Sequence, residues 1–364
     1  MSQTDNQTYS GLHRRYIILT EGQTHPTPAK LAASVLRYRP EQVVALLDST
    51  KAGGDAGEFM GCGHGVPIVA ALDDGIRLGA DALLLGITPA GGLVPQEWES
   101  LIESAIDRGL TVISGMHSLL CDRQDWVARA KASGAELIDL RLPPADIGVN
   151  GCRAVQHAGL RVHTVGSDCN CGKKVTALEI ERELRRQGYS TEFLATGQSG
   201  IAISGRGIAM DHVIADYVAG AAERLVLENR DRDILLIEGQ GAITHPLYSG
   251  VTLSMLHGFA PHVLILCHQV NRRIMRGTVD TPVADLRDLI SLYEQISAPV
   301  FPARVVGIAL NTMGLSEEQA RQALAEIRDR CDLAVTDVLR WGPAPLVDAL
   351  RPWIESKKIK GKAK

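Results

Sequence analysis

The 364-residue sequence is poor in aromatic residues, which make up 4% of it. Proteins that bind single-stranded nucleic acids stack bases on exposed Phe, Tyr and Trp side chains, so this scarcity argues against such a platform. The charge is also nearly balanced, with 38 Lys and Arg against 42 Asp and Glu and a net charge of -4. This balance provides no broad basic field for a phosphate backbone. Nucleic acid is therefore not an expected partner.

Long apolar runs are lacking as well. No run approaches the roughly 20 residues that cross a bilayer, and the polar opening MSQTDNQTYS does not have the pattern of a signal peptide. The seven cysteines are odd in number and irregularly spaced, which favours free thiols over a disulfide framework. Cys169 and Cys171 are too close together for an ordinary zinc half-site, and no second pair matches them. We expect a cytoplasmic protein with no metal and no membrane contact.

The sequence does have a regular alternation of short apolar runs and helical segments. It begins with the run at 16–20 and restarts with the run at 161–166. Such alternation is typical of α/β folds, in which helices cover both faces of a parallel sheet. The stretch 142–151 is rich in Pro and Gly and interrupts the rhythm. It predicts two domains, at 15–148 and 149–354.

The most informative segment is a glycine-rich stretch between a strand and a helix predicted from 174 to 187. It has the form Gly-x5-Gly-Lys, one residue longer than the commonest phosphate loop. Glycines let backbone N–H groups turn inward, the helix N-terminus adds partial positive charge, and Lys173 adds a full charge. The residues expected to hold phosphate are Gly166, Ser167, Asp168, Cys169, Asn170, Cys171, Gly172, Lys173, Lys174 and Thr176. The sequence therefore predicts that a phosphorylated small molecule binds here.

One position departs from a nucleotide-hydrolysing loop. Such a loop has Ser or Thr directly after its lysine, and that hydroxyl binds Mg²⁺. Here the position is Lys174, and the nearest hydroxyl is that of Thr176. An ammonium cannot ligate a metal, so we expect a loop that grips phosphate without the standard magnesium site. This favours a phosphorylated carrier such as coenzyme A over ATP hydrolysis.

Candidate catalytic residues follow another apolar strand of the second domain. The carboxyl ends of parallel strands face the ligand crevice, which places Glu238 beside the phosphate loop. It is a candidate general base or ammonium ligand, or a structural acid paired with Lys173. Gln240 is a candidate substrate ligand. Histidine is the residue type whose unperturbed side chain titrates near neutrality, and His245 is either catalytic or structural. Arg272, after a later strand, is a candidate clamp for a carboxylate or phosphate.

A second group of candidates follows the strand at 190–197. The segment 196–200 is expected to form a turn whose glycines and short polar side chains suit close approach to a ligand. Residues 211–228 are expected to form one helix, in which the first acid either caps the helix or binds substrate. The polar and charged side chains proposed here as substrate ligands are Gln198, Ser199, Arg206 and Asp211.

Four stretches of the second half stand out together: GSDCNCGKKVTALE (166–179), TGQSGI (196–201), IEGQGAITHPLYSGVTLSMLHG (237–258) and LILCH (264–268). They resemble a family once known only as a domain of unknown function and now associated with D-glutamate N-acetyltransferase, an enzyme of bacterial D-glutamate breakdown. The resemblance covers about residue 15 to 350. It implies a Rossmann-like N-terminal domain followed by a P-loop domain of the dethiobiotin-synthetase-like kind, both with mostly parallel sheets. It also implies acetyl transfer from acetyl-CoA to the amine of D-glutamate.

Acyl transfer requires a carrier held by its phosphates, a base that deprotonates an ammonium, and donors for the developing oxyanion. The basic loop, Glu238 or His245, and the backbone N–H groups of 239–241 are the candidates for these roles. Two other functions stay open: an ATP- and Mg-dependent ligase or carboxylase resembling dethiobiotin synthetase, and a non-enzymatic nucleotide-binding regulator. The partner in each case is a small molecule, and a symmetric homo-oligomer is the expected assembly.

Overall fold

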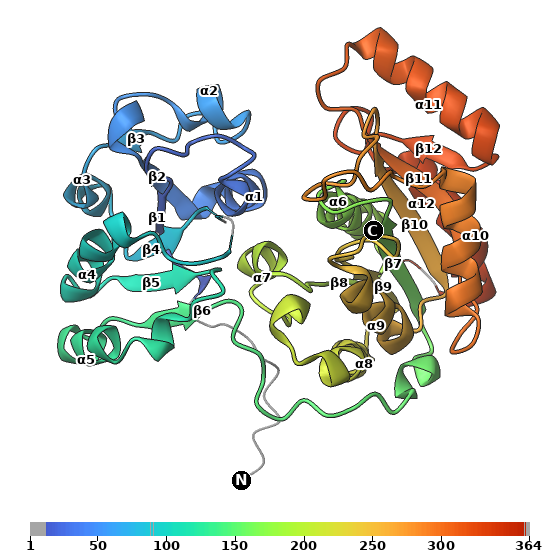
Figure 1. Cartoon of the computed structure of the whole chain (residues 1–364), viewed down its shortest axis with the longest axis horizontal. Helices are drawn as coiled ribbons and strands as arrows, with labels where there is room; N and C mark the ends of the chain where they lie inside the picture. Colours follow the sequence, from blue (N-terminus) through green and yellow to red (C-terminus); the bar gives the residue numbers. More distant parts are fainter. Residues whose placement is uncertain (1–11, 88, 90, 360, 362–364) are drawn as a thin grey trace. The chain divides into compact units, whose positions relative to one another are not determined.

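The computed structural model describes residues 12–87, 89, 91–359 and 361. The chain divides into two compact units (Figure 1). Unit 1 comprises Met1–Pro144 and Gly197–His212, and unit 2 comprises Ala145–Thr196 and Val213–Lys364. The residues at 197–212, which the sequence analysis placed in the second domain, therefore belong to unit 1.

Unit 1 is built on a six-stranded parallel sheet with the order β3-β2-β1-β4-β5-β6. This is the strand order of Rossmann-like folds and confirms the predicted fold class of the first domain. Its strands are β1 (Tyr16–Leu19), β2 (Val43–Leu47), β3 (Ile68–Val69), β4 (Ala82–Leu85), β5 (Thr111–Ser114) and β6 (Leu137–Asp139). Its helices are α1 (Lys30–Tyr38), α2 (Ala56–Met60), α3 (Leu72–Arg77), α4 (Glu99–Asp107), α5 (Gln124–Ser133) and α7 (Gln198–Ser204).

Unit 2 is built on a second six-stranded parallel sheet, ordered β12-β11-β10-β7-β9-β8. Its first strand, β7, lies centrally between β9 and β10. The strands are β7 (Leu160–Gly166), β8 (Thr191–Leu194), β9 (Ile234–Ile237), β10 (Val263–Gln269), β11 (Arg304–Asn311) and β12 (Ala334–Thr336). The helices are α6 (Lys173–Arg186), α8 (Val218–Glu228), α9 (Ser249–Phe259), α10 (Leu286–Ser297), α11 (Glu317–Cys331) and α12 (Ala344–Ser356).

Strand β10 shows why the strands of unit 2 appear as continuous apolar runs in the sequence. Ile265 and Cys267 pack in one hydrophobic cluster with residues of α6 and α12. Leu264 and Leu266 point to the opposite face and pack with residues of α9 and α10. Because helices cover both faces of the sheet, successive residues are all buried and the polar alternation of a one-sided sheet is absent. The parallel arrangement also brings the loops after β7, β9 and β10 to the same edge of the sheet.

The helix predicted over 211–228 is wrong in its first third. Met210–His212 and Ala215–Tyr217 form separate 3-10 turns, and α8 begins only at Val218. Ile214 lies between the two turns with φ -56° and ψ 135°, which is not helical. The physical reason is that the chain passes from unit 1 to unit 2 between residues 212 and 213. The apolar pattern continues through this crossing, but the helical conformation of the backbone does not.

Two helices were not predicted from the sequence. Helix α7 forms in the turn expected at 196–200, and α9 follows β9 in a segment for which no element was predicted. Both contain glycine near their start, Gly200 and Gly250, which lowers helix propensity by about 1 kcal/mol relative to alanine. Tertiary packing overrides this preference: α7 packs against α1, and α9 packs against α8.

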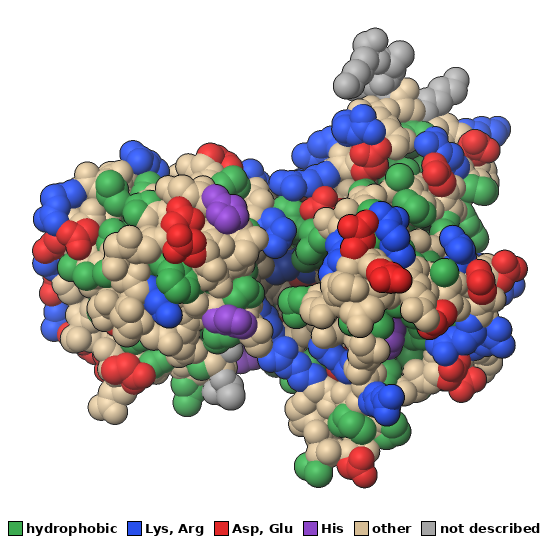
Figure 2. Space-filling model, turned by 90° about the horizontal axis from the view of Figure 1, so that it is seen from above, with side chains coloured by type: hydrophobic (Ala, Val, Ile, Leu, Met, Phe, Trp, Pro, Cys, Tyr) green, Lys and Arg blue, Asp and Glu red, His purple; other side chains and the backbone are tan. Residues whose placement is uncertain are grey.

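Acidic and basic side chains are interspersed over the surface of each unit in the view of Figure 2. Many of them pair across neighbouring elements, as where Arg129 on α5 bonds Asp107 on α4 at 2.7 Å. This mixture follows from the nearly equal numbers of the two charges. None of the described helices is long and apolar enough to cross a membrane.

Candidate active site

The phosphate loop connects the end of β7 to the start of α6, as predicted. Its tight course uses two left-handed backbone positions, at Asn170 with φ 53° and at Gly172 with φ 110°. Helix α6 begins at Lys173 with no side-chain cap and no acid in its first turn. The partial positive charge of the helix N-terminus is therefore directed at the loop, which is the arrangement that binds phosphate.

Lys173 folds back over this loop. Its Nζ donates to the carbonyl oxygen of Asp168 at 2.7 Å and lies 3.5 Å from Cys171 Sγ. Two glycines leave room for it, because a Cβ at Gly166 would lie 2.8 Å from Lys173 Nζ and a Cβ at Gly239 would lie 2.9 Å from Lys173 Cδ. The ammonium is thus held at the loop, where a phosphate oxygen can take the place of the carbonyl as its acceptor.

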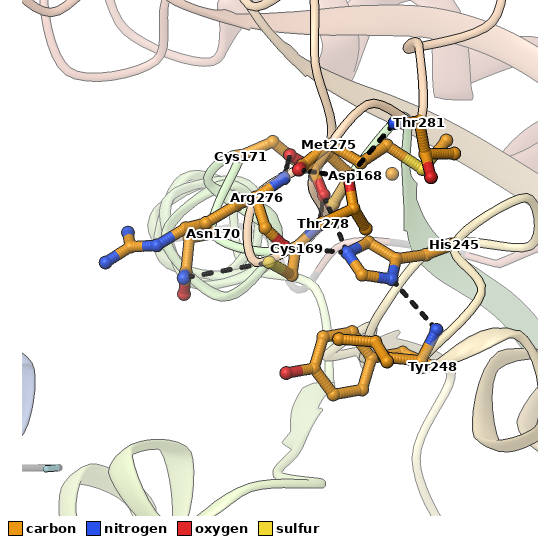
Figure 3. A network of polar contacts seen from close by, with 12 residues as sticks. Asp168, Cys169, Asn170, Cys171, His245, Tyr248, Met275, Arg276, Thr278 and Thr281 are labelled. Carbon is orange, nitrogen blue, oxygen red and sulfur yellow. Dashed lines mark hydrogen bonds and ion pairs between the residues drawn. The ribbon is translucent and has the colours of Figure 1, made fainter. Parts of the chain in front are cut away.

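Asp168, in the middle of the loop, is fully buried and accepts hydrogen bonds from three donors. Figure 3 shows it beside His245 and Arg276. Cys169 N donates to Oδ1 at 2.6 Å, while Arg272 Nη1 and Arg276 N donate to Oδ2 at 2.7 and 3.0 Å. Burial by itself raises the pKa of Asp168, but the bonds from Arg276 N and Arg272 outweigh it and hold that pKa below its ordinary value. The acid is therefore ionised and ties the loop to the segment after β10.

Arg272, predicted to be a substrate clamp, is already engaged with the loop. Besides Asp168, its Nη1 donates to the carbonyl oxygen of Cys169 at 2.6 Å, and its Nη2 bonds Gln269. Arg276 behaves differently: its backbone holds Asp168, while its exposed side chain runs past Asn170 and away from His245 (Figure 3). Arg276 is thus an exposed cation of this segment that is available to an incoming anion.

His245 is fully buried, and both its ring nitrogens are engaged. Leu247 N donates to Nδ1 at 3.2 Å, so the ring proton lies on Nε2, which is 3.0 Å from the carbonyl oxygen of Arg276 and 3.3 Å from Asp168 Oδ1. The ring also packs against Tyr248, with 4.6 Å between centroids. This geometry favours the structural reading of His245, because a base would first have to break one of these bonds.

Asp168, Cys169 and His245 each offer a ligand atom, and these atoms lie within 4.8 Å of one another, a spacing that could hold a metal ion. The carboxylate already carries the Arg272 guanidinium, whose charge repels a cation. The proton on His245 Nε2 occupies the position of a metal bond. The three residues are therefore better explained as a hydrogen-bonded support of the loop than as ligands.

Glu238 follows β9 and is buried beside the start of α6. Thr196 N donates to Glu238 Oε2 at 2.9 Å, and Thr196 Oγ1 donates to the Glu238 carbonyl at 2.8 Å. Gln240 Nε2 in turn donates to Thr196 Oγ1 at 3.0 Å. Burial lowers the pKa of the half-buried Lys174 to about 8, and the charge on Glu238 opposes the fall. Glu238 is therefore close enough for its charge to act on the second lysine of the loop.

The remaining predicted loop residues are anchored to strand β10. Ser167 N donates to the carbonyl oxygen of Cys267 at 3.0 Å, and Ser167 Oγ lies 2.8 Å from His268 Nδ1. Cys267 Sγ lies 3.6 Å from Thr176 Oγ1, which is buried. The hydroxyls of Ser167 and Thr176 therefore face the sheet.

Two residues that support the phosphate loop and the loop after β9 were not predicted from the sequence. The Tyr293 hydroxyl donates to the carbonyl oxygen of Gly166 at 2.8 Å and accepts from Ile243 N at 3.0 Å, so it joins the phosphate loop to the loop after β9. Thr164 Oγ1 accepts from Gly239 N at 3.0 Å. The sequence analysis suggested Gly239 N as an oxyanion donor, but this N–H is already bonded to Thr164 and is not free for that role. Tyr293 occupies an ordinary core position of an amphipathic helix, and no pattern signals its bonds.

The second predicted set of substrate ligands lies in unit 1. Gln198 and Ser199 begin α7, and a Cβ at Gly115 would lie 2.8 Å from Gln198 Cγ. Arg206 is half-buried after α7. Asp211 forms an ion pair with the buried Arg141 and does not cap a helix. The structure therefore groups these four residues with the Rossmann-like sheet, and Glu238, Gln240, His245 and Arg272 with the phosphate loop.

Two family models match the chain. A Rossmann-like domain of unknown function, DUF1611_N, matches residues 49–143, and a P-loop domain of unknown function, DUF1611_C, matches residues 148–347. The chain belongs to the DUF1611 family. This membership and the two parallel sheets confirm the predicted fold and family.

The chain is also similar to two enzymes and to one protein of solved structure. The chain is 37% identical over 328 residues to a D-glutamate N-acetyltransferase of Tritonibacter scottomollicae, covering 88% of this chain and 94% of that protein. It is 32% identical over 334 residues to a D-glutamate N-acetyltransferase of a Pseudoalteromonas species, covering 91% and 97%. The crystal structure of a DUF1611 family protein from Anabaena variabilis superposes with a TM-score of 0.89 at 34% identity, covering 93% of this chain and 100% of that one.

Proposed function

We propose that this chain is an N-acetyltransferase that moves an acetyl group from acetyl-CoA to the amine of D-glutamate. The observation that carries the proposal is the similarity to two relatives with that name, which extends over both domains. The phosphate loop supports it, because coenzyme A offers a pyrophosphate and a 3′-phosphate to a loop with two lysines and an uncapped helix N-terminus.

Within this proposal the loop holds the carrier and Glu238 removes the proton. Lys173 and the exposed Arg276 contact phosphate oxygens, while the Asp168–Arg272 pair keeps the loop in shape. Attack on the thioester needs a neutral amine, so a base must take a proton from the substrate ammonium. Glu238 is the better candidate of the two predicted bases. Both nitrogens of His245 are bonded, whereas the Glu238 carboxylate accepts from Thr196 N through Oε2 and still has further lone pairs that can take a proton.

The test is release of free CoA thiol from acetyl-CoA in the presence of D-glutamate, with L-glutamate and D-aspartate as competitors. The Glu238→Gln variant should lower kcat about a hundredfold or more, the usual size of a general-base contribution. Glu318→Gln, which makes the same change on an exposed acid of α11, is the matched control and should match the parent. The loss should not be rescued by more substrate, since it is a loss of kcat.

The same assay separates the rival functions. Absence of CoA release with D-glutamate, together with Mg²⁺-dependent turnover of ATP, would replace the transferase by a ligase. Binding of a nucleotide without turnover of any amine would indicate a regulator. Retention of full kcat in Glu238→Gln would leave the reaction intact but remove Glu238 as its base.

A further inference from the structure

A P-loop fold implies a magnesium ion beside the phosphates. The metal is ordinarily held by the hydroxyl that follows the loop lysine and by an acid at the end of a neighbouring strand. In this chain the acid is present as Glu238, after β9, which pairs directly with β7. The hydroxyl is absent, because the residue that follows the loop lysine is Lys174, in the first turn of α6.

Nearby residues do not supply the missing ligand. The Thr176 hydroxyl is buried against Cys267 of β10. Asp168, the other acid of the loop, is held by the Arg272 guanidinium at 2.7 Å. The residues at this end of the sheet therefore do not fit the magnesium site that the fold implies.

We propose that the Lys174 ammonium, set beside Glu238, replaces the magnesium ion and makes phosphate binding at this loop independent of metal. The proposal rests on the phosphate-binding part of the proposed function and not on acetyl transfer.

The surrounding charges support this assignment. Lys173 and Lys174 place two cations in the first turn of α6, where the helix dipole disfavours positive charge. Glu238 offsets the charge of Lys174, and a phosphate bound at the loop would offset the charges of both lysines. Burial lowers the pKa of Lys174 only to about 8, so its ammonium is still charged at neutral pH.

The experiment is titration calorimetry with inorganic pyrophosphate on the full-length chain at pH 7, in EDTA and in excess Mg²⁺. The parent should bind with the same affinity in both. Lys174→Ser, which restores the hydroxyl, should bind about tenfold to a hundredfold more weakly in EDTA, the usual loss for a hydrogen bond to a charged group. It should recover in Mg²⁺, and Mn²⁺ should bind to it but not to the parent in electron paramagnetic resonance.

Lys131→Ser on the exposed face of α5 is the control and should behave as the parent. Loss of pyrophosphate binding by the parent in EDTA overturns the proposal, and so does unchanged binding of Lys174→Ser in EDTA. The parent titration decides even where Lys174→Ser fails to fold. Metal-independent pyrophosphate binding without acetyl transfer would refute the proposed function alone, whereas acetyl transfer that requires Mg²⁺ would refute this inference alone.

Discussion

Arg272 and Asp168 form an ion pair across the phosphate loop, with 2.7 Å between Arg272 Nη1 and Asp168 Oδ2. Asp168 belongs to the loop, while Arg272 comes from the segment after β10, and the pair is largely shielded from solvent. An unpaired carboxylate inside an anion-binding loop would repel phosphate. The guanidinium therefore has two effects: it fixes the course of the loop and cancels a charge that opposes ligand binding.

Arg272→Ala should destabilise the protein and weaken phosphate binding together. It leaves the Asp168 carboxylate buried without its charged partner, which costs about 3 kcal/mol or more in comparable pairs. We expect a lower midpoint in urea denaturation and at least a tenfold higher Kd for pyrophosphate.

Arg273→Ala provides the comparison, because Arg273 is the exposed neighbour on the same segment. It should leave both quantities close to those of the parent. Equal stability of the two variants would show that the pair contributes no more than a surface contact.

The strands and the phosphate loop were predictable from the sequence. The apolar run expected at 161–166 corresponds to β7, which begins one residue earlier. This accuracy has a physical source, since a strand covered on both faces leaves an unbroken apolar run. The loop was equally clear because its glycines, lysine and following helix are local features.

The partners of the charged residues were not predictable. Asp168 and Arg272 are 104 positions apart, and the sequence shows two charges without showing that they meet. The sequence therefore predicts a substrate clamp at Arg272, whereas in the structure its guanidinium is already bonded to Asp168 and Cys169. The same limit explains α7, because a short helix does not reveal from its own residues which sheet it packs against.

Lys173→Ala should abolish most phosphate affinity at small cost in stability. The ammonium bonds a backbone carbonyl within the loop, and among the described residues no carboxylate pairs with it that its removal would leave alone. Loss of a hydrogen bond to a charged group corresponds to about tenfold to a hundredfold in Kd. Thermal-shift titration with acetyl-CoA measures it, and Lys131→Ala, on the exposed face of α5, is the control. A shift equal to that of the parent would remove Lys173 from the binding site.

Gly239→Ala should distort the site, while Gly250→Ala should not. A Cβ at Gly239 would lie 1.8 Å from the carbonyl oxygen of Thr164 and 2.9 Å from Lys173 Cδ, so the backbone after β9 has to move. A Cβ at Gly250, in α9, meets nothing within 4 Å, and alanine there raises helix stability by up to about 1 kcal/mol. Melting temperatures should therefore shift in opposite directions. A stable Gly239→Ala with normal pyrophosphate affinity would contradict the close approach at Thr164.

His163 on β7 should make the protein sensitive to acid. It is buried against Phe259, with 5.5 Å between ring centroids, and neither ring nitrogen has a hydrogen-bond partner within the part of the chain that the structure describes. Burial, with a smaller effect of the Lys173 charge, lowers the pKa of His163 to about 3. The unfolded chain takes up this proton near an ordinary pKa of about 6.5, so between these two values the unfolded state binds more protons.

The free energy of unfolding should therefore fall as the pH drops from about 6.5 towards 3, by up to about 1.4 kcal/mol per pH unit for this group. Above pH 6.5 the histidine is neutral in both states and has no effect. His163→Leu should reduce the slope of stability against pH in urea denaturation between pH 6.5 and 4. Part of the slope should remain, because burial also lowers the pKa of His262 to about 3. His13→Leu, at an exposed position, should keep the parent slope. An unchanged slope in His163→Leu would mean that His163 takes up its proton in the folded protein as readily as in the unfolded chain.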